Sequence, residues 1–346
     1  MLDALRQISS AAPAAARRSA LALLPEARAA VRREGEALCA ARPDLADLVR
    51  TRMEEPAMLP LPREVPLWGG ASLEAALALW CEQLDRNAAA AVALAADERA
   101  GWNEWMMAWV EGAADRATFF RAEVLVSCLR EIAAYGSLIA NPPAVRRLAA
   151  GQGRSDDLLD TRAWEFHGPG TIARDKNGLH LEGAGLAGWL HGEVGSHVVS
   201  VGYRPERLDG AGAGALFAVP AQPRSAAGWA AAAGEMVDYN YGFDTWHCSL
   251  CRSQSGVSNL RRTGRGLRMC STVAPDPCAT PGRDYRVELA LVPGWIQVLV
   301  DGRLIHLYPD TGSHGPALRP GRFGVRLFVR AVMRLTLTRL TVERCT

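Results

Sequence analysis

The spacing of apolar residues changes once along this chain, near residue 151, and this change limits the architectures that the chain can adopt. Before it, apolar residues recur every three or four positions, as in Leu73, Leu77 and Leu84, which is typical of helices with one buried face. After it, apolar and polar residues alternate, which is typical of strands. We therefore predict a chain of the α+β class, helical over residues 1–150 and all-β over residues 160–346.

The helical region divides further at a proline-rich stretch. Four prolines lie between residues 56 and 66, and proline removes a backbone donor and restricts the residue before it. We expect a helical arm over residues 1–50, a break over 56–66 and helices over 72–140. The apolar stripes of this region predict helix packing, and the alternative is a protein partner or self-association. Residues 151–160, rich in glycine and aspartate, are the expected linker.

The all-β region has its clearest unit where two alternating runs, 295–300 and 303–307, flank Asp301-Gly302. An Asp-Gly pair in this position is typical of a type I′ hairpin, whose positive φ angles aspartate and glycine tolerate. Alternation predicts further strands at 171–174, 179–182, 197–201, 286–291, 321–328 and 335–342. Many short strands without intervening helices predict a jelly-roll β-sandwich.

Charge and composition exclude several classes of partner. The 39 lysine and arginine residues nearly balance the 37 aspartate and glutamate residues, for a net charge of +2, so no nucleic-acid partner is expected. No stretch reaches about 18 uninterrupted apolar residues, so no membrane partner is expected. The first residues lack the apolar run of a secretory leader. We therefore expect a cytoplasmic protein with reduced thiols.

Several segments of the β region carry a family resemblance. They are Tyr-Asn-Tyr-Gly-Phe-Asp at 239–244, His-Cys-Ser-Leu-Cys-Arg at 247–252, Asn-Leu-Arg-Arg at 259–262, Val-Ala-Pro-Asp-Pro at 273–277 and Gly-Arg-Phe-Gly-Val at 321–325. With the Asp-Gly hairpin, they resemble the concanavalin A-like lectin and glucanase superfamily. Within it, they are similar to the YesU-like family of bacterial sandwich domains, over residues 165–345. The chain departs from that family's pattern at Phe243, which separates Gly242 from Asp244, and at Arg262, which replaces a lysine.

The resemblance implies a carbohydrate ligand, because the YesU-like family is found with genes for the use of pectin and rhamnogalacturonan. It also implies that the ligand is an acidic, pectic-type oligosaccharide or polysaccharide, bound on the concave face of the sandwich. Alternation after Gly242 places His247 and Ser249 on one face of a strand, and Trp246 and Leu250 on the other. A polar face around a histidine suits a glycan better than an apolar core.

The residue types in this segment fit β-elimination better than hydrolysis. A retaining hydrolase needs two close carboxylates, and no strand here carries the Glu-x-Asp-x-x-Glu pattern. A lyase needs a base and groups that stabilise an enolate, and the catalytic candidates are therefore His247, Tyr241 and Arg252. The candidates for substrate binding are Tyr239, Asp244, Ser249, Asn259 and Arg261.

The cysteines offer a rival interpretation as a zinc site. Cys248 and Cys251 form a Cys-x-x-Cys pair, and Cys270 and Cys278 follow downstream, so four thiols are present to ligate zinc. However, residues three apart in a strand point to opposite faces, and the second pair is widely spaced. We therefore expect neither a metal nor another cofactor.

Two functions stay open at this point. The first is an enzyme, either a polysaccharide or oligosaccharide lyase or a glycoside hydrolase, with its site on the sandwich. The second is a non-catalytic glycan-binding or scaffold protein whose helical half docks a protein partner. An enzyme concentrates a titratable side chain and its partners in one cleft, whereas a binding module presents aromatic platforms and hydrogen-bonding groups.

Overall fold

The structure is a computed structural model of the chain. It describes residues 36–47 (except 38), 61–96, 131–154 (except 133), 157–192, 197–208, 214–219, 245–251, 256–263, 270–310, 322–327 and 332–346. Two short 3₁₀ helices lie among them, η1 (Pro43–Leu45) and η2 (Thr161–Ala163). Among the described residues, no helix combines the length and hydropathy needed to cross a bilayer.

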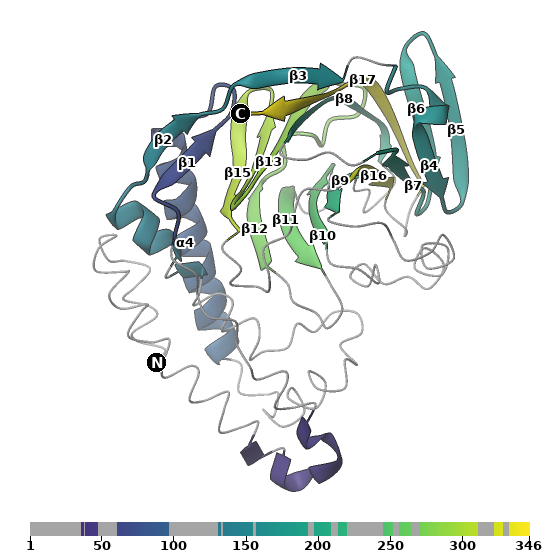
Figure 1. Ribbon diagram of the computed structural model, residues 1–346. Helices are drawn as coiled ribbons and strands as arrows, with labels where there is room; N and C mark the ends of the chain where they lie inside the picture. The colour runs from purple at the N-terminus through teal and green to yellow at the C-terminus, as the bar shows by residue number, and fades with distance from the viewer. Residues whose placement is uncertain are drawn as a thin grey trace.

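Two large antiparallel sheets form a β-sandwich (Figure 1). The seven-stranded sheet has the order β12 (Cys270–Pro275), β11 (Val257–Thr263), β10 (Thr245–Leu250), β9 (Gly214–Val219), β16 (Arg322–Leu327), β7 (Ala187–Leu190) and β4 (Trp164–His167). The eight-stranded sheet has the order β15 (Arg303–Pro309), β14 (Trp295–Val300), β13 (Tyr285–Val292), β8 (His197–Leu208), β17 (Met333–Cys345), β6 (Gly178–Gly183) and β5 (Gly170–Asp175), and β3 (Ala150–Arg154) pairs with β17. In Figure 1 the eight-stranded sheet lies above the seven-stranded sheet.

The strands expected from alternation are confirmed, and so is the sandwich that they predict. Asp301 and Gly302 have φ angles of 50° and 76°, the positive values that a type I′ turn requires. The turn joins β14 to β15, which pair in antiparallel register. The sequence pattern thus predicted both the hairpin and its turn.

The core lies between the two sheets. Alternate residues of the central strands β8 and β13, such as Val199, Val201 and Val287, are fully buried, because period-two alternation turns one face of each strand inward. One buried histidine joins the sheets within this core. His306 of β15 shares hydrogen bonds of 2.9 Å with the hydroxyls of Ser258 in β11 and Thr272 in β12.

The region before the sandwich packs directly on it. Part of the proline-rich stretch is not a break but a strand, β1 (Glu64–Leu67), which pairs in parallel with β2 (Ala144–Arg147). Trp68 donates its indole N–H to Glu288 of β13 at 2.9 Å, and Gln297 of β14 accepts the backbone N–H of Trp68 at 3.2 Å. These contacts cover part of the outer face of the eight-stranded sheet, over β13 and β14, and they explain why proline-rich residues are ordered there.

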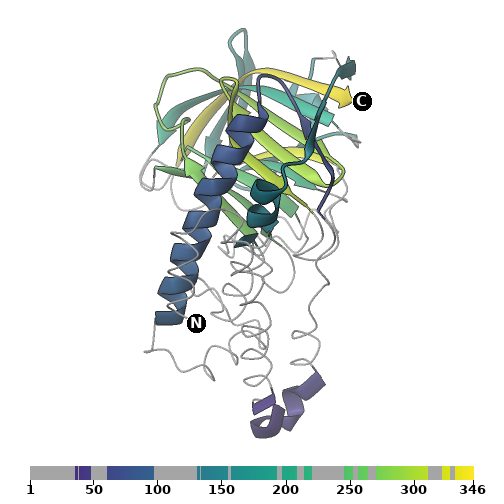
Figure 2. The same cartoon turned by 90° about the vertical axis from the view of Figure 1, so that its left-hand side faces the viewer.

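Helix α4 (Leu73–Ala96) closes the end of the sandwich where the edge strands β12 and β15 meet (Figure 2). Trp80 donates its indole N–H to the carbonyl of Leu307 in β15 at 3.1 Å. One turn later, the Gln83 amide donates to the carbonyl of Val273 in β12 and accepts its N–H at 3.2 Å. A free strand edge is a template for aggregation. Helix α4 binds the backbone of the edge strand β15 through Trp80 and that of the edge strand β12 through Gln83.

Much of the predicted helical region lies outside the described residues. Besides α4, helical backbone is present at residues 134–140, where Tyr135 and Leu138 are buried. The expected linker differs from the structure, since its glycine-rich start forms strand β3 and Leu158 is buried. Glycine fits at residue 151 because an added Cβ would lie 3.0 Å from the backbone oxygen of Arg344 in β17.

We expect Gln83→Leu to destabilise the sandwich and to promote self-association. The substitution keeps the volume of the side chain but leaves both backbone groups of Val273 without their partner, at a cost of roughly 1–3 kcal/mol. Denaturant unfolding and light scattering measure the two effects. Replacing the neighbouring, partly exposed Glu82 by Leu is the matched control, and equal behaviour of the two variants would contradict the role of Gln83.

Candidate functional site

The register of the seven-stranded sheet aligns residues from all of its strands in two transverse rows. The first row contains Ser271, Arg261, His247, Phe217, Gly324, Trp189 and Glu165. The second row contains Val273, Asn259, Ser249, Ala215, Arg326, Ala187 and His167. Directly opposed positions of an antiparallel ladder belong to the same face, so both rows lie on one face of the sheet. We call this face the transverse face.

The transverse face points away from the other sheet. At the alternate positions of the same strands, residues such as Trp246, Cys248, Leu260 and Phe323 belong to the core between the sheets. Trp246, for example, packs against Tyr308 with ring centroids 4.8 Å apart and donates to Asp310 at 3.1 Å. The expectation that Trp246 serves the core is therefore confirmed.

Four of the eight residues predicted for the site lie in the described strands. His247 and Ser249 are in β10, and they are the register partners of Arg261 and Asn259 in β11. The ladder therefore brings together, as neighbours, two pairs whose members are at least ten residues apart in sequence. Asn259 is buried, with 4% of its surface exposed, and Ser249 is partly exposed. Tyr239, Tyr241, Asp244 and Arg252 lie outside the described residues.

Trp189 is the aromatic residue of the transverse face that sequence reasoning missed. It is fully buried, yet it is not part of the cluster between the sheets. Its ring lies over Gly324 of the neighbouring strand, where an added Cβ would be 2.5 Å from the ring. Gly324 therefore provides the space that the indole needs. Because the indole is fully buried, a ligand reaches its ring face only if the side chains that cover it move.

Ionisable side chains lie toward the β4 end of the two rows. Glu165 and His167 of β4 approach each other to 3.0 Å between a carboxylate oxygen and Nε2. Arg326 of β16 is only 6% exposed, and a buried guanidinium requires compensating polar partners. Glu165 and His167 are neighbours within β4, whereas Arg326 joins their row only through strand pairing.

The cysteines take a different arrangement from the one expected. Strand β10 ends at Leu250, and Cys251 follows it with a φ of 59°, so Cys251 does not continue the alternation as predicted. Instead Cys248, Cys251 and Cys278 all join the buried core. Burial raises the pKa of Cys248 to about 12 and raises that of Cys278 strongly, which disfavours the thiolate that metals bind. Among the described side chains, no group of three or more forms a metal site.

Comparisons with known proteins find distant likenesses in structure only. No protein-family model matches the chain, and no curated protein matches it. A Bacillus subtilis protein of unknown function with a galectin-like fold is 20% identical, and the similarity covers 57% of this chain and 99% of that one with a TM-score of 0.46. The carbohydrate-binding module CBM66 from Bacillus subtilis is 13% identical over 52% of this chain and 95% of its own, with a TM-score of 0.39. A β-glucanase from Bacillus licheniformis is 9% identical over 57% and 98%, also with a TM-score of 0.39.

Proposed function

We propose that this protein binds an acidic saccharide on the transverse face of its seven-stranded sheet. The observation that carries the proposal is the pair of rows, which align His247, Arg261 and Arg326 with Trp189 and its glycine neighbour. Guanidinium groups bind carboxylates through paired hydrogen bonds. A uronate unit carries such a carboxylate, which supports a pectic-type ligand.

The proposal includes membership of the YesU-like family, on the motifs at 239–277. In the catalytic form of the proposal, His247 is the base of a β-elimination, and Tyr241 and Arg252 assist it. Ladder pairing of His247 with Arg261 supports this form, because a cation beside the base stabilises the negative charge that develops on the enolate. In the binding form, the same residues hold the saccharide without transferring a proton.

His247→Ala tests the proposal and separates its two forms. We expect the substitution to weaken the binding of oligogalacturonate by roughly 1–3 kcal/mol, because a hydrogen bond to a charged group is lost. If the protein is a lyase, turnover falls by roughly 10²–10⁴-fold, the usual contribution of a general base. Calorimetry measures the affinity, and the ultraviolet absorbance of the unsaturated uronate product measures turnover.

The matched control is Thr171→Ala, at an exposed position of β5 in the other sheet. It should leave binding and turnover unchanged. Absence of binding by the unaltered protein to oligogalacturonate and related uronates defeats the proposal. Binding that survives His247→Ala unchanged places the ligand elsewhere and contradicts the assignment of this face.

A further inference from the structure

The outer face of the eight-stranded sheet contains a hollow of about 400 Å³, within the range of small-molecule sites. It lies over β8, β13 and β17, on the side of the sandwich opposite to the transverse face. Its polar lining consists of Ser200, Asp284, Arg286, Asp301, Thr338, Arg339, Thr341 and Glu343. We call it the β8–β17 hollow.

A bulge in β17 builds the floor of the hollow. The register between β8 and β17 shifts between Leu337 and Arg339, so that Thr338 has no partner in β8. A Cβ added to Gly202 would lie 2.3 Å from the Thr338 hydroxyl oxygen, so glycine is needed there. The hydroxyl of the extra residue, Thr338, therefore lies close to Gly202, which has no side chain. Bulges often re-aim side chains beside functional sites.

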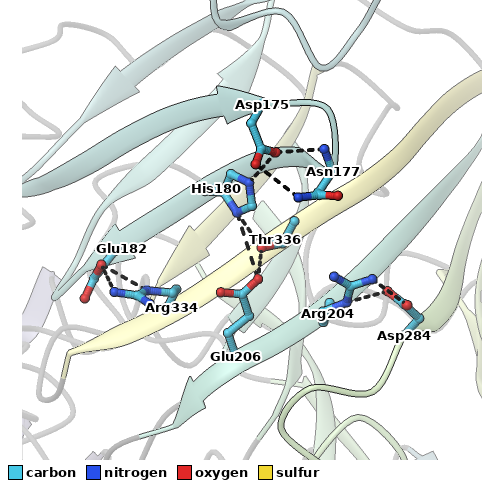
Figure 3. A network of polar contacts seen from close by, with 9 residues as sticks. All are labelled: Asp175, Asn177, His180, Glu182, Arg204, Glu206, Asp284, Arg334 and Thr336. Atoms are coloured by element: carbon cyan, nitrogen blue, oxygen red, sulfur yellow. Dashed lines mark hydrogen bonds and ion pairs between the residues drawn. The ribbon is translucent and has the colours of Figure 1, made fainter.

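Ion pairs and backbone contacts hold the walls in place. Arg204 binds Asp284 through two hydrogen bonds, of 2.8 and 2.6 Å (Figure 3). Asp301 accepts the backbone N–H of Arg286 at 2.9 Å, and the Arg286 guanidinium donates to Glu288 at 2.9 Å. These carboxylates and this guanidinium keep one orientation before any ligand arrives, which lowers the entropic cost of binding.

A second polar network links the strands beside the hollow (Figure 3). His180 of β6 bonds to Asp175 of β5 at 2.7 Å and to Thr336 of β17 at 2.8 Å. Thr336 donates to Glu206, the residue at which β8 bulges. Glu182 and Arg334 pair at 2.7 Å on the same face. Four adjacent strands are therefore linked by side chains as well as by their backbones.

The chemistry of the lining selects one class of ligand. Three carboxylates, two guanidinium groups and three hydroxyls alternate around the hollow, so donors and acceptors are mixed and the charges nearly balance. An anion meets carboxylates there, and a purely apolar ligand leaves the charged groups of the wall without hydrogen-bond partners. A hydroxyl group both donates and accepts, so a neutral ligand with several hydroxyls satisfies both kinds of group. We propose that the β8–β17 hollow is a second binding site, for a neutral saccharide.

This second site is independent of the proposal for the transverse face. The two faces belong to different sheets, and their lining residues do not overlap. The ionisable groups also differ, since arginines and histidines outnumber the one carboxylate, Glu165, in the rows of the transverse face, whereas the hollow has more carboxylates than guanidinium groups. A single chain that holds an acidic saccharide on one side and a neutral one on the other would bridge two parts of a mixed polysaccharide.

The test is titration of the full-length protein with cellobiose, maltose and lactose, followed by calorimetry and by NMR. At least one of these probes should bind saturably. The double substitution Arg339→Ala and Thr341→Val should weaken that binding by about tenfold or more, because it removes a charged donor and a hydroxyl from the wall. Thr341→Val alone keeps the branched shape that suits a strand, and it should weaken binding severalfold even if the double variant folds poorly.

Two further variants separate this site from its surroundings. Arg334→Ala removes an exposed arginine from the same strand and the same sheet face, outside the hollow, and it should leave the affinity unchanged. His247→Ala, on the transverse face, should also leave the affinity for the neutral sugar unchanged. The inference is overturned if none of the three sugars binds saturably up to about 10 mM, or if binding survives both substitutions in the hollow.

Discussion

Between pH 6.5 and 4.5 we expect the free energy of unfolding to fall by about 2 kcal/mol, because of the buried His306. Burial lowers the pKa of His306 to about 3, from an ordinary value of 6.5. Below pH 6.5 the unfolded chain therefore takes up a proton that the folded protein excludes, so acid favours unfolding. The loss begins near the unfolded pKa and continues as the pH falls toward 3.

In this pH window, the effect of the histidine on stability is separate from the effect of the carboxylates with lowered pKa values. The pKa values of Asp160 and Asp175 are lowered by hydrogen bonds to Arg162 and His180, respectively. Stability that depends on such a depressed carboxyl pKa is present above the unfolded value of about 3.9 and is lost only below it. A decline in stability above pH 4.5 is therefore assigned to a group with a higher unfolded pKa.

His306→Gln checks the assignment. Glutamine keeps one donor and one acceptor toward the hydroxyls of Ser258 and Thr272, but it does not titrate. Urea unfolding at several pH values should give the variant a flatter pH dependence than the unaltered protein. His191→Gln, at an exposed position, is the control and should keep the original slope. An unchanged slope in His306→Gln would show that another group causes the acid sensitivity.

The second large effect is expected at Trp80, whose side chain is completely buried. Trp80→Ala should reduce the free energy of unfolding of the sandwich by about 3–5 kcal/mol. The substitution leaves a cavity beside Trp295, whose ring centroid is 6.0 Å away, and it removes the hydrogen bond to Leu307. Since these partners lie in β14 and β15, loss of the indole weakens the sandwich as well as α4.

Denaturant unfolding followed by far-ultraviolet and near-ultraviolet circular dichroism measures this effect. Both signals should shift together to lower denaturant concentration, because helix and sandwich share one core. Glu82→Ala changes a partly exposed surface side chain of the same helix, which pairs with Arg86, and such substitutions change stability by about 0.5 kcal/mol or less. A sandwich signal that keeps its midpoint in Trp80→Ala would show that α4 folds separately.

Local sequence patterns predicted those features that neighbouring residues decide. The hairpin at Asp301-Gly302 was predictable because its positive φ angles restrict the choice of residue within the turn itself. The alternation in β10 was predictable because Trp246, Cys248 and Leu250 meet the core at every second position. The same alternation placed His247 and Ser249 on the opposite face.

Features that depend on distant partners were not predictable in the same way. The prolines suggested a break where β1 forms. The free energy gained when β1 pairs with β2, and when the adjoining Trp68 contacts β13 and β14, depends on residues far away in the sequence. Likewise, the glycines that suggested a linker allow β3 to approach β17 closely. Cys251 was placed in the strand because alternation alone does not reveal where a strand turns into the core.

The candidate sites also have some features that neighbouring residues decide and others that depend on distant partners. The sequence by itself determined a β-sandwich and the polar character of the strands that carry His247, Ser249, Asn259 and Arg261. Only the tertiary structure decided that β10 and β11 pair in a register that opposes these residues, and that Trp189 lies over Gly324. It alone also decided where the hollow lies on the other sheet. The physical reason is that strand alternation is a local property, whereas register and sheet order depend on contacts between segments far apart in the chain.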